Sequence, residues 1–274
     1  MAPAGSGKAA ARKLASSTGQ KRRAVLTIVH NEAVFLPIWL SYYSQFFAAE
    51  DIYVLDHEST DDSTSGPGFN RIPVVNDAVN HTWMASVLEE QQRKLFERYD
   101  VVLTTDIDEI VAPSPDTGTL GEYIDRFDDE FVNCRGRELL HMKDREGPFD
   151  PGEPVLAQRR YWFANGGYDK PALAAVPTKW DPGLHRLSDG RFNQDPTLNL
   201  VHLHRMDYEI CQARHRLRSR LRWSELDIDA GWGAHNLITD DSEFERWFYE
   251  DSCFEQFEIR IEIEPVPDIW REQF

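Results

Sequence analysis

The sequence predicts an α/β fold in which a mainly parallel sheet is flanked by helices and followed by an irregular mixed α+β half. Short apolar runs alternate with helical patterns through residues 24–112, in the order strand, helix, strand, strand, helix, strand. Polar residues follow three of these apolar runs, and ligands of such sheets bind at the carboxyl ends of the strands. Beyond Pro113, turns are frequent, aromatic residues are many and the predicted strands are short.

Each element of the first half follows from its local pattern. The predicted strands are apolar runs that end in polar residues, and the predicted helices carry apolar side chains at helical spacing. The strands are AVLTIVHNE at 24–32, DIYVLDH at 51–57, IPVVND at 72–77 and DVVLTTDIDEIVAP at 100–113. The helices are AVFLPIWLSYYSQFF at 33–47 and WMASVLEEQQRKLFERY at 83–99.

The second half contains fewer regular patterns. Short strands are predicted within PVLAQRRYWFA at 154–164 and TLNLVHLHRM at 197–206, and alternating apolar residues predict another within 254–270. The basic run RHRLRSRLRW at 214–223 reads as the solvated face of a helix. We therefore divide the chain into a tail at 1–23, an α/β half at 24–112 and a second half of the same domain at 113–274.

The charge balance excludes several classes of partner. A net charge of −17 over 274 residues argues against nucleic acid and against an anionic membrane surface as partners. No apolar run reaches membrane-spanning length, and the basic segment 1–23 is predicted to be a disordered tail rather than a signal peptide. Cys134, Cys211 and Cys253 fit neither a disulfide framework nor a metal knuckle, so we expect reduced thiols in a cytoplasmic protein.

Three acids close the last apolar run of the first half: Asp106, Asp108 and Glu109. Carboxylates that are buried without a partner cost several kcal/mol, so they must be paired, protonated or bound to a cation. On an extended strand, Asp106 and Asp108 would share one face with their Cα atoms about 6.5 to 7 Å apart. Two converging carboxylates suit Mg²⁺ or Mn²⁺, and the alternative is an acidic strand end without a metal.

Three segments of the first half together resemble a known family. TIVHNEAVFLPIWLSYY, IYVLDHESTDDST and YDVVLTTDIDEI are similar to the successive motifs of family-2-like glycosyltransferases with the GT-A fold, in the subgroup with an NE...LPxWL opening and a DxDE metal motif. The resemblance covers residues 24–112 well and the remainder loosely. It implies a hexosyltransferase that uses Mn²⁺ or Mg²⁺ to move a sugar from a nucleoside-diphosphate sugar, commonly a UDP-sugar, to an acceptor hydroxyl with inversion. The acceptor, a glycan or a small molecule, would bind the half at 113–274.

The resemblance also implies roles for individual residues. Asp106 would lie near the ribose and the metal, Asp108 would ligate the metal, and Asn31, Glu32 and Asp56 would hold the base and ribose. His57 and Glu58 stand where an Asp or Asn and a Gly are more usual, which leaves the identity of the base open.

Several of these residues also have an ordinary structural interpretation. Asn31 and Glu32 suit a helix N-terminus, and the loop that begins at Asp56 suits a capped turn. On the helix at 83–99, Gln92 and Arg93 either reach the nucleotide or belong to a solvated helix face.

The second half offers further ligands. His202 and His204 are two residues apart on an apolar strand, so both face the same side. At least one of them is a candidate ligand that would complete the coordination of the metal. The alternative is a pair of core histidines, each bonded to a backbone carbonyl.

A general base and a group that neutralises the diphosphate are also expected in the second half. Asp195, then His185, are the candidate bases because both lie in a Gly- and Pro-rich stretch typical of active-site loops. Arg214, Arg216 or Arg218 could bind the diphosphate, since guanidinium groups match phosphate oxygens.

Two other functions remain open. A nucleotidyltransferase that makes nucleotide sugars would use a similar sheet, but its first loop is usually rich in glycine, and VHNEAVFLP contains none. A non-catalytic carbohydrate-binding or scaffold protein could retain the same fold. Metal-dependent nucleotide binding would distinguish the transferase from the scaffold.

Overall fold

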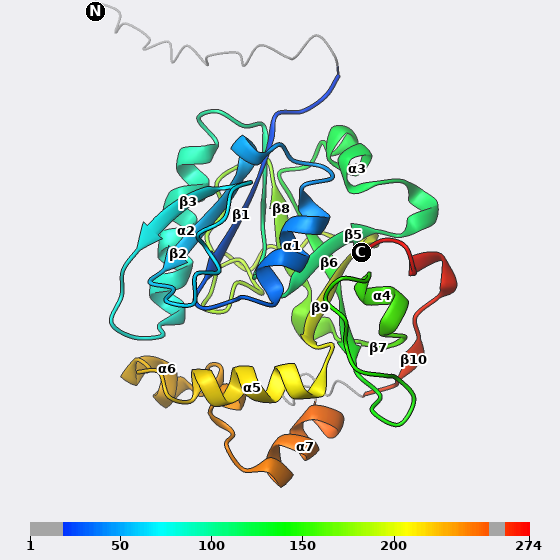
Figure 1. Ribbon diagram of the computed structural model, residues 1–274. Helices are drawn as coiled ribbons and strands as arrows, with labels where there is room; N and C mark the ends of the chain where they lie inside the picture. Colours follow the sequence, from blue (N-terminus) through cyan, green and yellow to red (C-terminus); the bar gives the residue numbers. More distant parts are fainter. Residues whose placement is uncertain (1–18, 252–260) are drawn as a thin grey trace, which may run out of the picture.

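The computed structural model describes residues 19–251 and 261–274, and their strands form one ten-stranded sheet (Figure 1). In its first half, β1 lies between β2 and β4, β3 lies outside β2, and all neighbouring strands are parallel. The bounds are β1 (Arg23–Val29), β2 (Ile52–His57), β3 (Asn70–Val74) and β4 (Val101–Thr104). The predicted α/β fold with a parallel first half is confirmed.

Helices α1 (Phe35–Tyr43) and α2 (His81–Leu95) cover opposite faces of these strands. Because successive side chains of β1 point to opposite faces, Val25 packs in the apolar cluster that contains α1, and Leu26 packs in the cluster that contains α2. Both clusters are buried, and each helix is therefore held by its apolar face. Because β1, β2 and β4 are parallel, their carboxyl ends lie at the same edge of the sheet.

The second half adds antiparallel strands to the far side of β4. β8 pairs antiparallel with β4 and with β6, while β9 pairs parallel with β6 and antiparallel with β5. The strands are β5 (Glu109–Pro113), β6 (Phe131–Leu140), β7 (Tyr161–Ala164), β8 (Lys170–Ala174), β9 (Gln194–Arg205) and β10 (Glu264–Pro265). This mixed pairing agrees with the irregular second half that the sequence predicts.

The remaining helices are short. They are α3 (Leu120–Arg126), α4 (Val155–Gln158), α5 (Tyr208–Arg218), α6 (Glu225–Ala230) and α7 (Asp241–Glu250). Single 3₁₀ turns occur at Ala49–Asp51, Pro115–Thr117, Gly166–Tyr168, Ala234–Leu237 and Asp268–Trp270. Figure 1 shows α5 and α6 lying across the edge of the sheet at which β1 and β2 end. In the part of the chain described here, no helix is both long and apolar enough to cross a membrane.

Two sequence predictions need correction. The segment 100–113 is not one strand, because the backbone turns at 105–108 and β5 leaves β4 to pair with β9. The amide of Glu109 donates to the carbonyl of Asp106 across this turn, so Asp106 and Asp108 do not share the face of an extended strand. The segment 154–164 begins as helix α4 and only its end, β7, is a strand.

Other sequence predictions fall partly outside the described residues. Residues 1–18 of the predicted tail, and Cys253 and most of the strand predicted within 254–270, lie there. Cys134 and Cys211 are buried free thiols.

Candidate active site

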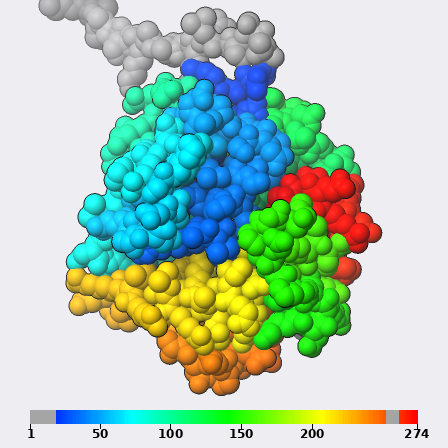
Figure 2. Space-filling model, viewed as in Figure 1, coloured from blue at the N-terminus to red at the C-terminus, as the bar shows by residue number. Residues whose placement is uncertain are grey.

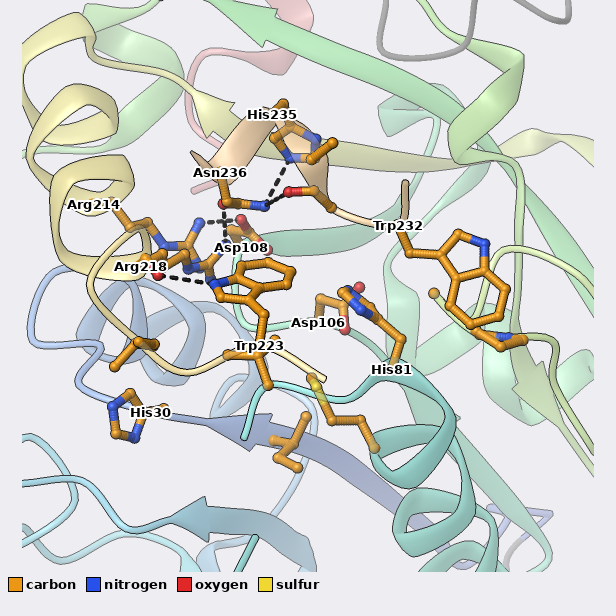
Figure 3. Close-up of a pocket in the computed structure, with 18 of the residues that line it drawn as sticks. His30, His81, Asp106, Asp108, Arg214, Arg218, Trp223, Trp232, His235 and Asn236 are labelled. Carbon is orange, nitrogen blue, oxygen red and sulfur yellow. Dashed lines mark hydrogen bonds and ion pairs between the residues drawn. The ribbon is translucent and has the colours of Figure 1, made fainter. Parts of the chain in front are cut away.

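A cavity of about 940 Å³ lies where β1, β2 and β4 end, and residues of α5 and of the segment 221–236 form its opposite wall. Figure 2 shows α5 packed against the surface of the first half, and Figure 3 shows side chains from both halves converging on the cavity. The wall includes His30, Glu32, His57, Glu58, Asn76, His81, Asp106, Asp108, Tyr168, His185, His202, His204, Arg214, Arg218, Trp223, Trp232 and His235. The fold therefore brings the polar ends of several strands to one place, as expected for a parallel sheet.

Asp108 and the two histidines of β9 form a compact group in this cavity. The nearest Asp108 oxygen lies 3.7 Å from His202 Nε2 and 3.4 Å from His204 Nδ1. One ligand atom from each of the three residues lies within 4.8 Å of the others, and all three residues are buried. One carboxylate and two imidazoles in this arrangement can bind a divalent transition-metal ion.

Glu138 on β6 orients His202. The two residues are register partners of the β6–β9 ladder, and His202 Nδ1 lies 2.9 Å from Glu138 Oε2. Burial alone would lower the pKa of His202, but the carboxylates of Glu138, Asp108 and Glu109 outweigh it and raise that pKa above its usual value. Once Nδ1–H donates to Glu138, Nε2 faces Asp108 with a lone pair, which is how metal-binding histidines are commonly held.

His204 is oriented from the other side by helix α5. Its Nε2 lies 2.8 Å from Nε2 of His215, so Nδ1 is the nitrogen that faces Asp108. Burial, with nearby His235 and three arginines, lowers the pKa of His215 to about 2. A neutral His215 can accept the proton of His204 Nε2, and this leaves the Nδ1 lone pair of His204 available as a ligand.

Arg214 on α5 is the present counter-ion of Asp108. Its guanidinium donates to Asp108 and also to Glu32, whose Oε1 lies 2.6 Å from Nη2. Burial would raise the pKa of Asp108, but Arg214 and the two histidines hold it well below the usual range. Arg218, one turn further along α5, reaches the same Glu32 oxygen at 3.1 Å. The loop after β1 and the turn after β4 are thus joined through α5.

Asp106 has a different counter-ion from Asp108. Lys170 of β8 is fully buried, and its ammonium lies 2.6 Å from Asp106 and 2.7 Å from Glu109. Burial and the charge of Asp106 raise the pKa of Glu109 to about 7 despite the opposing effect of Lys170. Two of the three acids in the motif therefore share one lysine as their counter-ion.

The loops after β1 and β2 are tied together by Asn31. Its amide oxygen accepts the N–H of Thr60 at 2.7 Å, and its own N–H donates to the hydroxyl of Ser59. Asn31 and Glu58 have φ of 55° and 57°, which non-glycine residues rarely adopt. Such strain collects at ligand sites, and here it shapes the part of the wall formed by His30, His57 and Glu58.

Some residues singled out from the sequence have structural partners away from the cavity wall. Asp56 accepts hydrogen bonds from Ser59, Thr64 and Arg71, and Gln92 accepts from Thr178. Arg93 is exposed on α2. Asp195 accepts from Tyr123 and Thr197 beside a separate cavity of about 310 Å³.

Other candidates do reach the main cavity. His185 lines it, and burial together with Lys170 lowers the pKa of His185 well below its usual value. Arg214 and Arg218 also line it, whereas Arg216 is exposed and pairs with Asp241.

Sequence reasoning did not single out Lys170, Glu138, His81 or Asp227. Lys170 and Glu138 each stand in or beside an apolar run, and a charged residue there is a signal for a buried ion pair. His81 and Asp227 stand in polar segments that carry no such signal.

Comparison with solved structures finds glycosyltransferases. The mannosyltransferase PcManGT from Pyrobaculum calidifontis, solved with GDP-Man and Mn²⁺, is 17% identical over 73% of this chain and 61% of its own, with a TM-score of 0.40. Glucosyl-3-phosphoglycerate synthase from Mycobacterium tuberculosis, solved with Mn²⁺, UDP and glucosyl-3-phosphoglycerate, is 14% identical over 75% and 81%, with a TM-score of 0.35. The galactosyltransferase LgtC, solved with donor and acceptor sugar analogues, is 18% identical over 47% and 53%, with a TM-score of 0.26.

The chain thus spans less than two thirds of the length of the mannosyltransferase. No family model matches the sequence, and no curated protein does. At these TM-scores the activity has to be argued from the residues of the site.

Proposed function

We propose that this chain is a cytoplasmic, metal-dependent glycosyltransferase of GT-A type that moves a hexose from a nucleoside-diphosphate sugar to an acceptor hydroxyl. The observation that carries the proposal is the group formed by Asp108, His202 and His204 at the strand ends, inside a cavity large enough for a nucleotide sugar. The motifs at 24–112 that resemble family-2-like glycosyltransferases support the same reaction. A UDP-sugar donor and inversion at the anomeric carbon follow from that resemblance.

The donor atoms of the group favour Mn²⁺ over Mg²⁺. Mg²⁺ prefers oxygen ligands and keeps its waters, whereas two imidazole nitrogens suit a transition metal. Asp108, His202 and His204 would hold the ion, and Glu138 and His215 would keep the two imidazoles oriented. When bound, the metal would supply Lewis-acid stabilisation of the leaving diphosphate.

The chain's own charges suit the donor as well. Arg214 and Arg218 present guanidinium groups to the cavity and are held by Glu32. Either can bind phosphate oxygens, and Arg218 is the more accessible of the two. Asp106, held by Lys170 at the same wall, would bind the ribose, while His30, His57 and Asn76 would surround the base. Trp223 and Trp232 also line the cavity and would contact the acceptor.

The test is thermal melting of the full chain with UDP or GDP, each with Mn²⁺, with Mg²⁺ and without metal. A nucleotide at a hundred times its dissociation constant should add about 2.7 kcal/mol of stability. We expect one nucleotide to shift the melt only with metal, and Asp108→Asn to lose this shift. Asp116 is an exposed carboxylate a few residues after the motif, so Asp116→Asn is the matched control and should keep the metal-dependent shift.

A second variant guards against misfolding of Asp108→Asn. His202→Asn keeps a donor at the Nδ1 position for Glu138 but removes the Nε2 ligand, so it should fold and bind Mn²⁺ more weakly. If no nucleotide shifts the wild-type melt with any metal, the transferase assignment fails and the scaffold alternative is favoured. If a nucleoside triphosphate with a sugar 1-phosphate yields diphosphate instead, the protein is a nucleotidyltransferase.

A further inference from the structure

His81 and Asp227 form a hydrogen-bonded pair in the wall of the cavity. His81 Nδ1 lies 2.8 Å from Asp227 Oδ2, and the backbone N–H of His81 donates to the same oxygen at 3.0 Å. Asp227 is fully buried, whereas 22% of the His81 side chain is exposed. The carboxylate is thus hidden behind the imidazole, and the imidazole is the member of the pair that a ligand can reach.

The backbone explains why two residues so far apart in sequence meet. The N–H of Val79 donates to the carbonyl of Arg222 at 2.8 Å, and the N–H of Ser224 donates back to Val79 at 2.9 Å. This short ladder brings together the first turns of α2 and α6, which contain His81 and Asp227. The first turn of a helix favours a negatively charged side chain, and Asp227 lies in the first turn of α6.

The position of the imidazole is fixed on several sides. Its ring lies 6.0 Å from that of Trp223, and a Cβ on Gly233 would come within 3.1 Å of His81 Cε1. Figure 3 shows the ring between Trp223 and Trp232, directed into the cavity that also contains Asp106 and Asp108. Since Nδ1 is used by Asp227, Nε2 is the nitrogen left for a ligand.

We propose that His81 is the general base that deprotonates the acceptor hydroxyl, and that Asp227 positions it. The proposal rests on the transferase function proposed above. Nε2 of His81 takes the proton of the acceptor O–H as the acceptor oxygen forms a bond to the anomeric carbon. The bond from that carbon to the diphosphate oxygen breaks, and its electron pair leaves with the diphosphate. Asp227 holds the Nδ1–H tautomer, which keeps the Nε2 lone pair on the cavity side.

The other candidate bases fit this role less well. Asp195 belongs to the separate cavity beside Tyr123. The ring of His185 packs against that of Tyr168, with ring centroids 5.3 Å apart. Asp106 is already paired with Lys170, and Asp108 with Arg214. His30 and His57 are also half-buried in the wall, but a ring nitrogen of each contacts a backbone carbonyl, whereas His81 is held by a carboxylate.

The test compares cleavage of the nucleotide sugar by water with its cleavage by azide. Water needs a base to remove its proton, whereas azide is already an anion. In His81→Asn the amide can replace Nδ1–H as the donor to Asp227, but no base remains. We expect hydrolysis of the nucleotide sugar with Mn²⁺ to fall about 100-fold or more, and formation of glycosyl azide to stay near the wild-type rate.

The variant of the positioning residue gives a second readout. Asp227→Asn should lower the rate of hydrolysis at saturating donor while its KM stays unchanged, and azide should again restore turnover. Asp229→Asn, an exposed carboxylate of the same helix, is the control and should leave both reactions unchanged.

The outcomes separate this proposal from the one on which it rests. If both variants hydrolyse the donor at the wild-type rate, or if hydrolysis and azidolysis fall together, His81 is not the base although the enzyme is still a transferase. If the wild-type protein neither binds a nucleoside diphosphate with Mn²⁺ nor hydrolyses its sugar, the transferase function itself is wrong and the base assignment falls with it.

Discussion

The ammonium of Lys170 lies 2.6 Å from a carboxylate oxygen of Asp106. This contact joins a strand of the second half, β8, to the motif that ends the first half. It gives Asp106 a permanent counter-charge, so this carboxylate is available to a ligand only through its remaining acceptor capacity. Asp108, by contrast, is paired with an arginine from a surface helix and with two histidines.

Replacing Lys170 should strongly destabilise the protein. Lys170→Met leaves Asp106 and Glu109 without their cation, and removing one partner of a buried pair typically costs about 3–5 kcal/mol. Urea denaturation followed by fluorescence measures the change. Lys94→Met removes an exposed pair with Glu90 and should cost less than about 0.5 kcal/mol. Equal losses in the two variants would mean that Lys170 is not a structural counter-ion.

Replacing Arg214 should increase the affinity for Mn²⁺. In the wild type the cation has to share Asp108 with the guanidinium, whereas Arg214→Met leaves the carboxylate with only the two histidines beside it. We expect the dissociation constant for Mn²⁺ to fall about tenfold, which is about 1.4 kcal/mol. Calorimetric titration with Mn²⁺ alone measures it. Arg216→Met, an exposed residue of the same helix, should bind as the wild type does. Weaker binding in Arg214→Met would contradict competition for Asp108.

The hydrogen bonds to Asp56 should make the free energy of unfolding depend on pH in the acid range. Burial would raise the pKa of Asp56, but bonds from Ser59, Thr64 and Arg71 lower it below the usual 3.8. The ionised Asp56 carboxylate therefore contributes fully to the free energy of unfolding above about pH 3.8. This contribution is lost as the pH falls through the lowered pKa. Asp56→Asn should cost about 1–3 kcal/mol at pH 7, and the gap to the wild type should narrow below pH 3.8.

Urea denaturation from pH 2.5 to 7 measures this gap. Asp61→Asn, in the exposed loop nearby, should change the free energy of unfolding by no more than about 0.5 kcal/mol. A gap for Asp56→Asn that is the same at every pH would show that the charge of Asp56 contributes nothing.

Gly136 should not tolerate even one methyl group. A Cβ there would lie 2.2 Å from the backbone oxygen of Asn165 and 2.9 Å from Tyr168. Gly136→Ala therefore forces β6 away from the turn at Gly166–Tyr168 and should cost about 3 kcal/mol. Gly66→Ala, which has open space, should change stability by less than about 0.5 kcal/mol. Thermal melting of the two variants compares them directly.

The sequence predicts the parallel first half well because its information is local. The apolar runs of β1, β2 and β4 and the spacing of α2 each lie within one segment, and periodicity identifies them. The turn at 105–108 is different. Apolar residues precede and follow this turn. The strand is interrupted there because β4 pairs with β1 whereas β5 pairs with β9.

The site is predictable in part for the same reason. Asp108, His202 and His204 are marked by polar residues in apolar runs, and the structure brings them together. Their orientation depends on Glu138 and His215, which are neighbours only after the strands pair and α5 packs. The pair of His81 and Asp227 spans 146 positions and is created by a loop-to-loop ladder that no local pattern encodes.

The contact between Glu32 and Arg214 spans 182 positions and joins the first loop of the chain to its fifth helix. Its two charges can meet only after nearly everything between them has folded, so the entropy of closing a very long loop must be overcome before the pair forms. The charged groups of the cavity are therefore expected to assemble late and together. A protein truncated at residue 112 would carry Glu32, Asp106 and Asp108 with none of their cations. Such a fragment would contain the recognisable motif and yet have no binding site.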